Sequence, residues 1–177
     1  MSDLPSLASL DYVPYIDESG VLPIRFQGKV GVYAIFDAEQ TLQFISYSRD
    51  VYLSLQQHLV RQPQGCYWLK VHQIEKPNRT ILETIRDAWI AENGTVPLGN
   101  GPDEAKWNQP IDVKAVMTAE EQSNYADALD EMTQAKLLKK AARRVEEEVL
   151  QTLKARGVQM QFRFDPKLKE SGVLNLK

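Results

Sequence analysis

The sequence Gly31-Val32-Tyr33-Ala34-Ile35-Phe36-Asp37 is followed, after four intervening residues, by Leu42-Gln43-Phe44-Ile45-Ser46. Both segments are rich in β-branched and aromatic residues, which suit a pleated and half-buried surface. The connection at 38–41 is short and mainly polar, and such a connection between two strands is typical of a β-hairpin. We therefore predict a hairpin over 30–37 and 42–47, and we expect the neighbouring segments to pack on it.

Two helices and two further strands are predicted around this hairpin. Asp50 and Asn78 each stand where a helix N-cap belongs, and Gly94 stands where a helix commonly ends. Pro23 lacks the N–H that a central strand donates, so its segment is expected at a sheet edge. Together these signals predict an edge strand at 21–26, a helix at 50–61, a strand at 66–75 and a helix at 79–93.

The second half of the chain predicts a loop, a long helix and two more strands. Trp107 lies in a segment rich in proline and glycine, where we expect it to anchor the loop. Thr118 and Glu121 fit a capping box, and the helical pattern after them runs up to Gly157. Alternating apolar residues predict a short strand on either side of the helix. These elements are a loop at 94–110, a strand at 111–117, a helix at 119–156, a strand at 158–164 and a polar tail at 165–177.

One apolar stripe runs along the predicted long helix, in steps of three or four residues. A stripe this narrow needs a partner, which we expect to be the chain's own domain. The alternatives are a second copy of the chain, giving a dimer through the long helix, or a helix of another protein. The members of the stripe are Leu129, Met132, Ala135, Leu138, Ala142, Val145, Val149 and Leu153.

The predicted fold class is therefore α+β, with a small, mainly antiparallel sheet and flanking helices, followed by a long C-terminal helix and a terminal strand. We predict four segments along the chain. They are an N-terminal arm at 1–29, a core at 30–95, a loop with a short strand at 96–117, and a long helix, strand and tail at 118–177 that pack on the core.

The composition is that of a globular protein of 177 residues, with 43% hydrophobic residues and a formal net charge of -3. The negative charge argues against a nucleic-acid binder, because phosphate contacts need a basic surface. The single cysteine, Cys66, excludes a disulfide within the chain and a cysteine cluster for zinc. We expect neither a signal peptide nor a membrane span, which needs roughly 18 apolar residues in a row. These expectations favour a soluble, cytoplasmic protein.

The order hairpin, helix, strand, helix resembles that of a known family. Gly31-Val32-Tyr33 on the first strand and Phe44-Ile45-Ser46 on the second are separated by ten residues. This arrangement resembles the GIY-YIG nuclease superfamily over roughly a third to a half of the chain, at about 30–95. The whole chain is also similar to uncharacterised proteins of this fold from cyanobacteria and plastids. The resemblance implies a GIY-YIG-like core and, in active members, hydrolysis of a phosphodiester assisted by one divalent metal ion.

The resemblance assigns the family's active-site positions to residues of this chain. Tyr33 matches the tyrosine of the first triplet, which positions or deprotonates the attacking water. Phe44 stands at the tyrosine of the second triplet, and Ser54 stands at the helix arginine that balances charge on the phosphate. The phenol and the guanidinium are therefore missing at these two positions. Glu83 and Asp87, four residues apart on one predicted helix face, are the candidates for the metal-binding carboxylate.

The missing groups favour a module without catalysis. Losing one preorganised electrostatic group raises a reaction barrier by about 2.7–4 kcal/mol, and two are missing here. We therefore predict a pseudoenzyme that binds a protein partner or aids assembly and needs no cofactor. The alternatives are a structure-specific endonuclease with an altered site, which would use Mg²⁺ or Mn²⁺, and a nucleic-acid binder without cleavage. In a purely structural interpretation, Tyr33 is a core aromatic, and Glu83 and Asp87 lie on a solvated helix face beside Arg79 and Arg86.

The densest positive run of the sequence lies in the predicted long helix. Glu146, Glu147 and Glu148 follow it, so its default interpretation is a helix surface crossed by ion pairs. The alternative is contact with an acidic partner or with nucleic acid. Residues 1–110 hold nine Lys or Arg against thirteen Asp or Glu, so the nuclease-like part is acidic and fits a protein partner better than DNA. The candidate partner-binding residues are Lys136, Lys139, Lys140, Arg143 and Arg144.

Overall fold

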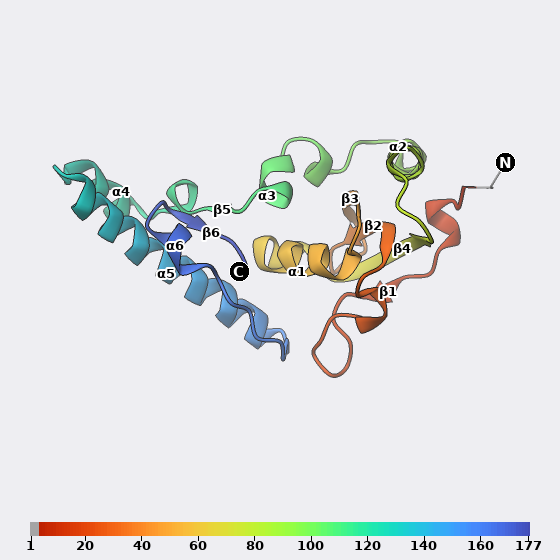
Figure 1. Cartoon of the computed structure of the whole chain (residues 1–177), viewed down its shortest axis with the longest axis horizontal. Coiled ribbons are helices and arrows are strands. Elements are labelled where there is room, and N and C mark those ends of the chain that lie inside the picture. The colour runs from red at the N-terminus through yellow and green to blue at the C-terminus, as the bar shows by residue number, and fades with distance from the viewer. Residues whose placement is uncertain (1–3) are drawn as a thin grey trace. The chain divides into compact units, whose positions relative to one another are not determined.

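The computed structural model describes residues 4–177 and has an α+β fold (Figure 1). It contains a small antiparallel sheet with flanking helices, a long helix and a separate pair of short strands, so the predicted fold class is confirmed. The chain divides into two compact units, with the boundary between Gln109 and Pro110. The first unit holds the hairpin, and the second holds the long helix.

The predicted hairpin is confirmed and forms part of the sheet of the first unit. Its strands are β2 (Val30–Phe36) and β3 (Leu42–Ser48). The Asp37 carboxylate accepts hydrogen bonds from two N–H groups of the turn and so fixes its shape. β4 (Trp68–Ile74) and the short β1 (Val13–Pro14) complete a sheet in the order β1-β4-β2-β3, in which all neighbours are antiparallel.

The two helices predicted beside the hairpin are confirmed, and local capping explains where they begin and end. α1 (Val51–Arg61) begins after Asp50, whose side chain accepts a hydrogen bond from a backbone N–H of the first turn. α2 (Arg79–Asn93) begins after Asn78 in the same way. It ends at Gly94, whose φ of 85° lies in the left-handed region that glycine adopts without strain.

These helices pack on opposite faces of the sheet, because successive side chains of a strand point to opposite sides. On one face, Val32 and Ala34 of β2 form a buried core with Trp89 of α2. On the other face, Tyr33 of the same strand reaches His58 of α1. Burying one large apolar side chain stabilises a fold by about 1.5–3 kcal/mol, so the alternation along β2 attaches both helices to the sheet.

The edge strand predicted at 21–26 is wrong. Residues after Pro23 form a 3-10 turn, η2 (Ile24–Phe26). The edge of the sheet is instead occupied by β1, in which Pro14 lies opposite Trp68. A proline is tolerated in an edge strand, and here Pro14, not Pro23, is the proline that lies in the paired edge strand. Two more 3-10 turns of this unit are η1 (Leu7–Ser9) and η3 (Pro63–Gly65).

The segment predicted as a loop at 94–110 contains two short helical pieces. They are η4 (Leu98–Asn100) and α3 (Glu104–Asn108). Trp107 of α3 is only 3% exposed, so its predicted anchoring role is confirmed. The anchored segment lies against β3, and this contact positions the candidate site described below.

The second unit is built around one long helix and a two-stranded sheet. The strand predicted at 111–117 is reduced to two residues because a 3-10 turn follows at once. The strand predicted at 158–164 is wrong, since only Phe164 makes an isolated bridge, to Leu176. The pairing strand lies instead in the predicted tail. The elements are β5 (Ile111–Asp112), η5 (Val113–Val116), α4 (Ala119–Asp127), α5 (Glu131–Ala155), α6 (Pro166–Lys169) and β6 (Val173–Leu174), with β5 and β6 antiparallel.

The helix predicted at 119–156 is broken into α4 and α5 (Figure 1). Asp130 explains the break, because its carboxylate accepts hydrogen bonds from the N–H and the hydroxyl of Thr133 and so starts a new helix. Leu129 is consequently 99% exposed and Met132 is 71% exposed, so neither belongs to the buried stripe. The later part of the predicted stripe is confirmed as buried at Leu138, Ala142, Val145 and Leu153. The predicted capping box of Thr118 and Glu121 is also confirmed.

Candidate functional site

Four ring-bearing side chains from four elements meet in the first unit. They are Tyr33 of β2, Phe44 of β3, His58 of α1 and Trp107 of α3, and all four are buried. The Phe44 and Trp107 rings are stacked, with centroids 5.1 Å apart and planes inclined by 15°. The Phe44 ring meets His58 edge-on at 4.9 Å. The packing therefore holds α3 against the hairpin and brings Tyr33 and Phe44, two of the predicted catalytic positions, into one cluster. The third position, Ser54, is hydrogen-bonded to Tyr33, so the structure brings all three together.

A chain of hydrogen bonds connects the polar atoms of this cluster. His58 Nδ1 lies 3.0 Å from the carbonyl oxygen of Trp107, and His58 Nε2 lies 2.7 Å from the Tyr33 hydroxyl. A carbonyl oxygen can only accept, so Nδ1 carries the hydrogen and the neutral ring accepts at Nε2. The Tyr33 hydroxyl therefore donates a hydrogen bond to His58 Nε2. Arg61 Nη1 donates to the same Trp107 carbonyl oxygen at 3.1 Å.

Both titratable rings of this network are neutral at ordinary pH. Burial lowers the pKa of His58 to about 3, and the nearby Arg61 charge acts in the same direction. Burial also raises the pKa of Tyr33 well above its ordinary value, against opposing hydrogen bonds from Ser46 and Ser54. A base with so low a pKa accepts protons poorly near neutral pH. In this state the network acts as a structural clamp between α1, β2 and α3.

Ser54, the third predicted catalytic position, lies at the start of α1. Its hydroxyl donates to Ser48 Oγ at 2.7 Å, and the Ser48 hydroxyl in turn donates to the Asp50 carbonyl oxygen at 2.9 Å. These bonds tie the end of β3 to the first turn of the helix. The catalytic roles assigned to Tyr33, Phe44 and Ser54 stay predictions.

The two candidate metal ligands point to different partners. Glu83 Oε1 accepts hydrogen bonds from Arg79 Nε at 2.7 Å and from the Tyr47 hydroxyl at 3.0 Å. The bond from Arg79 is the main reason that the pKa of Glu83 lies below its ordinary value. Asp87 accepts from Arg86 Nε at 2.9 Å. Within residues 4–177, no group of three or more His, Cys, Asp or Glu side chains is arranged to hold a metal ion.

A polar hollow of about 300 Å³ opens beside this cluster, between β3, α2, η4 and α3. Asn100 closes one of its walls, because its side-chain amide accepts from the Ile45 N–H at 2.8 Å and donates to the Ile45 carbonyl oxygen at 2.7 Å. The amide thus satisfies an outer edge of β3 that would otherwise be open to another strand. The lining residues are Phe44, Ile45, Ser46, Arg86, Asp87, Ile90, Asn100, Glu104 and Asn108.

Sequence reasoning missed the roles of His58 and Asn100. His58 carried a usable signal, since it follows Leu55 by three residues on the apolar side of its helix. A polar ring at such a position must find buried partners. The sequence around Asn100 gives no signal of its role, because its hydrogen-bond partner Ile45 lies 55 residues away in the sequence.

The predicted partner-binding residues all lie on α5 in the second unit, but they differ in their surroundings. Arg144 is tied to Glu121 and Glu148 at 2.7 and 2.8 Å, and Lys139 lies 4.0 Å from Glu170. The other three, Lys136, Lys140 and Arg143, are exposed. The structure therefore confirms ion pairs for part of this run only.

Comparison with known proteins gives one partial match and no family model that matches the chain. The chain is 34% identical over 96 residues to the bifunctional monothiol glutaredoxin-S16, chloroplastic, of Arabidopsis thaliana. The match spans 50% of this chain and 33% of that protein, so the chain covers about a third of the length of this relative. Separately, none of the helices in the described part of the chain is long and apolar enough to cross a membrane.

These findings contradict the predicted membership in the GIY-YIG nuclease superfamily. The matched relative is named a glutaredoxin, not a nuclease, and no family model supports the resemblance. The predicted function as a GIY-YIG-fold binding module, and the alternative of an altered nuclease, are corrected with it. The physical weakness of the prediction was that the spacing of two triplets carried it, while the phenol and guanidinium were already missing at Phe44 and Ser54.

Proposed function

We propose that the chain is a module of a glutaredoxin-type redox system without a reactive thiol of its own, in which a partner protein supplies the reactive cysteine. Burial of the only cysteine carries this proposal. Cys66 is fully buried, and its sulfur donates to the His58 carbonyl oxygen at 3.6 Å. A reactive cysteine is an accessible thiolate in an electropositive setting. Cys66, as folded, does not meet this requirement.

The partial match supports the same division of labour. The Arabidopsis relative is named both bifunctional and a monothiol glutaredoxin, and two thirds of its length lies outside the match. That remaining length has room for a part that bears the thiol. Two parts joined in one chain meet at a high effective concentration, whereas separate chains need an interface of their own. We therefore expect the present chain to bind a separate protein that has glutaredoxin chemistry.

The proposal assigns neither a metal nor another cofactor to the chain itself. For the compartment, we propose a reducing one such as the cytoplasm, because the chain relies on a buried thiol and on no disulfide.

Two measurements test this function. Ellman's reagent should find no reactive thiol in the native chain and one thiol per chain after denaturation in guanidinium. Isothermal titration should then detect binding of the native chain to a purified fragment of the Arabidopsis protein that holds the length outside the match. The variant Cys66→Ala is the matched control, and it should bind as the original chain does, since the buried thiol is not part of the interface.

Either of two results contradicts the proposal. Rapid reaction of native Cys66 with the reagent would show that the chain offers its own thiol. An absence of heat and of complex in sedimentation, with both proteins folded, would remove the proposed partner.

A further inference from the structure

The exposed face of α5 carries cations that make no ion pair with the described part of the chain. Lys136, Lys140 and Arg143 follow one another at steps of four and three, so they lie on one face of the helix. All three are exposed, and within residues 4–177 none makes an ion pair or a side-chain hydrogen bond. Lys136 acts on Asp130 only through longer-range charge. Lys139 and Arg144, by contrast, are paired.

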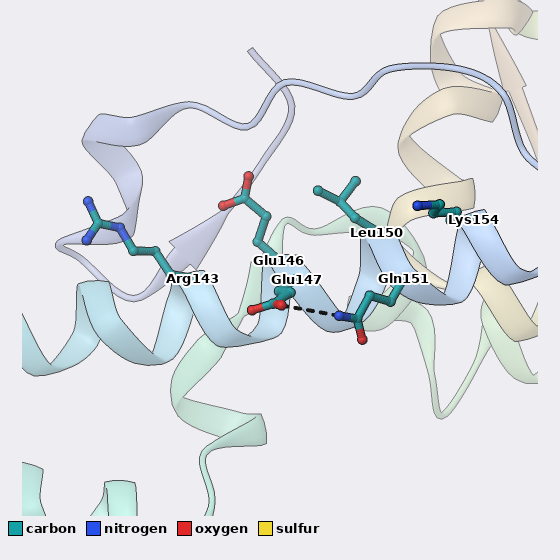
Figure 2. Close-up of a pocket in the computed structure, with 6 residues that line it drawn as sticks. All are labelled: Arg143, Glu146, Glu147, Leu150, Gln151 and Lys154. Carbon is teal, nitrogen blue, oxygen red and sulfur yellow. Dashed lines mark hydrogen bonds between the residues drawn. The ribbon is translucent and has the colours of Figure 1, made fainter.

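A hollow continues this face toward the end of the helix (Figure 2). It has a volume of about 250 Å³, and every residue that lines it comes from α5. Leu150 supplies an apolar side chain there, with Arg143 and Lys154 at the two ends. Arg143 and Lys154 are eleven positions apart in the sequence, which corresponds to roughly 16 Å along the helix. The other lining residues are Glu146, Glu147 and Gln151.

The carboxylates in this hollow are already engaged. Glu146 is paired with Lys169, and Glu147 accepts a hydrogen bond from Gln151 at 3.2 Å, drawn as the dashed line in Figure 2. Their negative charges lie beside the cations, so the face is not a continuous positive strip. Closely spaced phosphates would be repelled at Glu147, and nucleic acid needs a row of cations along its backbone. A protein segment can place separate carboxylates on separate cations.

We propose that this face of α5, from Lys136 to Lys154, binds an acidic segment of a protein partner. An apolar side chain of that segment enters the hollow at Leu150, and its carboxylates meet Arg143 and Lys154 at the ends, with Lys136 and Lys140 extending the contact. The match of charge decides the occupant, because within residues 4–177 these cations make no ion pair of their own. The inference does not depend on whether the partner is a glutaredoxin.

Fluorescence anisotropy of the full chain tests this proposal at low ionic strength. The probe is a fluorescein-labelled helical peptide with a central leucine and glutamates on both sides. Each of the variants Lys140→Glu and Arg143→Glu should weaken binding by about threefold, and the triple variant with Lys136→Glu by about twentyfold. The matched control, Lys167→Glu, reverses an exposed lysine of the same unit off this face and should bind like the original chain. Leu150→Gln should weaken binding without changing its salt dependence, because it removes an apolar contact and no charge.

Several outcomes overturn the proposal. An anisotropy that the acidic peptide leaves unchanged would overturn it, and so would a triple variant that binds the peptide within twofold of the original chain. A single-stranded oligonucleotide of equal length that binds more tightly than the peptide would assign the face to nucleic acid. Sedimentation that finds a dimer of the original chain, and a monomer of the triple variant, would assign the face to a second copy. Circular dichroism of each variant must match the original spectrum, since glutamate and lysine have similar helix propensities.

Discussion

His58 makes the stability of the first unit depend on pH, with a sign that its burial sets. In the folded chain the pKa of His58 is about 3, whereas an unfolded histidine titrates near 6.5. Below the unfolded pKa, the unfolded chain therefore binds one more proton than the folded chain at this position. The free energy of unfolding falls as the pH falls, and it continues to fall until the folded pKa is reached.

The size of the effect follows from the protons bound. Between about pH 7.5 and about pH 5, the unfolded histidine takes up almost a full proton and His58 takes up none, so the free energy of unfolding falls by about 2 kcal/mol. The carboxyl groups with lowered pKa, Glu83, Glu121 and Asp130, have ordinary values of 4.5 or below. Their loss of stability begins mainly below this range, so histidine dominates within it.

The assay is urea unfolding followed by tryptophan fluorescence. All three tryptophans lie in the first unit, so this signal reports the unfolding of that unit alone. His58→Gln keeps a donor and an acceptor but does not titrate, and we expect it to remove most of the pH dependence in this range. His72→Gln is the matched control, because the pKa of His72 is also lowered by burial but the residue is only partly buried. Suppose that the free energy of unfolding depends on pH equally in the original chain and in His58→Gln, and does not depend on pH in His72→Gln. This result would refute the role assigned to His58.

Three further predictions concern single contacts. Asn100→Ala leaves the N–H and carbonyl of Ile45 without their partner, and should lower the free energy of unfolding by about 1–3 kcal/mol in the same urea assay, whereas the exposed-site control Asn108→Ala in the same unit should change it little. Asp130→Ala removes the cap that starts α5 and should cost about 1 kcal/mol, visible as faster amide exchange in the first turn of that helix; unchanged exchange would contradict the capping role. Mg²⁺ should leave the melting temperature unchanged, because Glu83 is already hydrogen-bonded and a bound ion would raise stability by mass action; a rise that saturates with Mg²⁺ would contradict this expectation.

The hairpin and the two helices of the first unit could be predicted because their signals are local. Asn78 and Gly94 mark both ends of α2 within one stretch of sequence, and the structure places the helix between them. The break before α5 was missed although its signal is also local. Asp130 and Thr133 form an N-cap, but the apolar spacing continued through Leu129 and outweighed it.

The candidate site could not be assembled from the sequence for a different reason. Tyr33 and His58 are 25 residues apart, and His58 and Trp107 are 49 apart. The spacing of these residues in the sequence does not predict that they are in contact, because the contact depends on how α1 and α3 pack on the sheet. Composition and local pattern fix which residues belong to a helix or strand. They do not fix which polar atoms share a hydrogen bond across elements.

The availability of each polar group decides where this chain can accept a ligand. The Tyr33 hydroxyl already donates a hydrogen bond to His58, and the Glu83 carboxylate already accepts one from Arg79. A ligand that recruits either group must first break such a contact, and a buried group left unpaired costs about 1–3 kcal/mol. Lys140 and Arg143 have no such contact to break, so an acidic group bound there costs mainly the ordering of two flexible side chains, about 0.5–1.5 kcal/mol each. A ligand is therefore expected to bind more readily on α5 than at the ring cluster, even though the ring cluster holds the predicted catalytic positions.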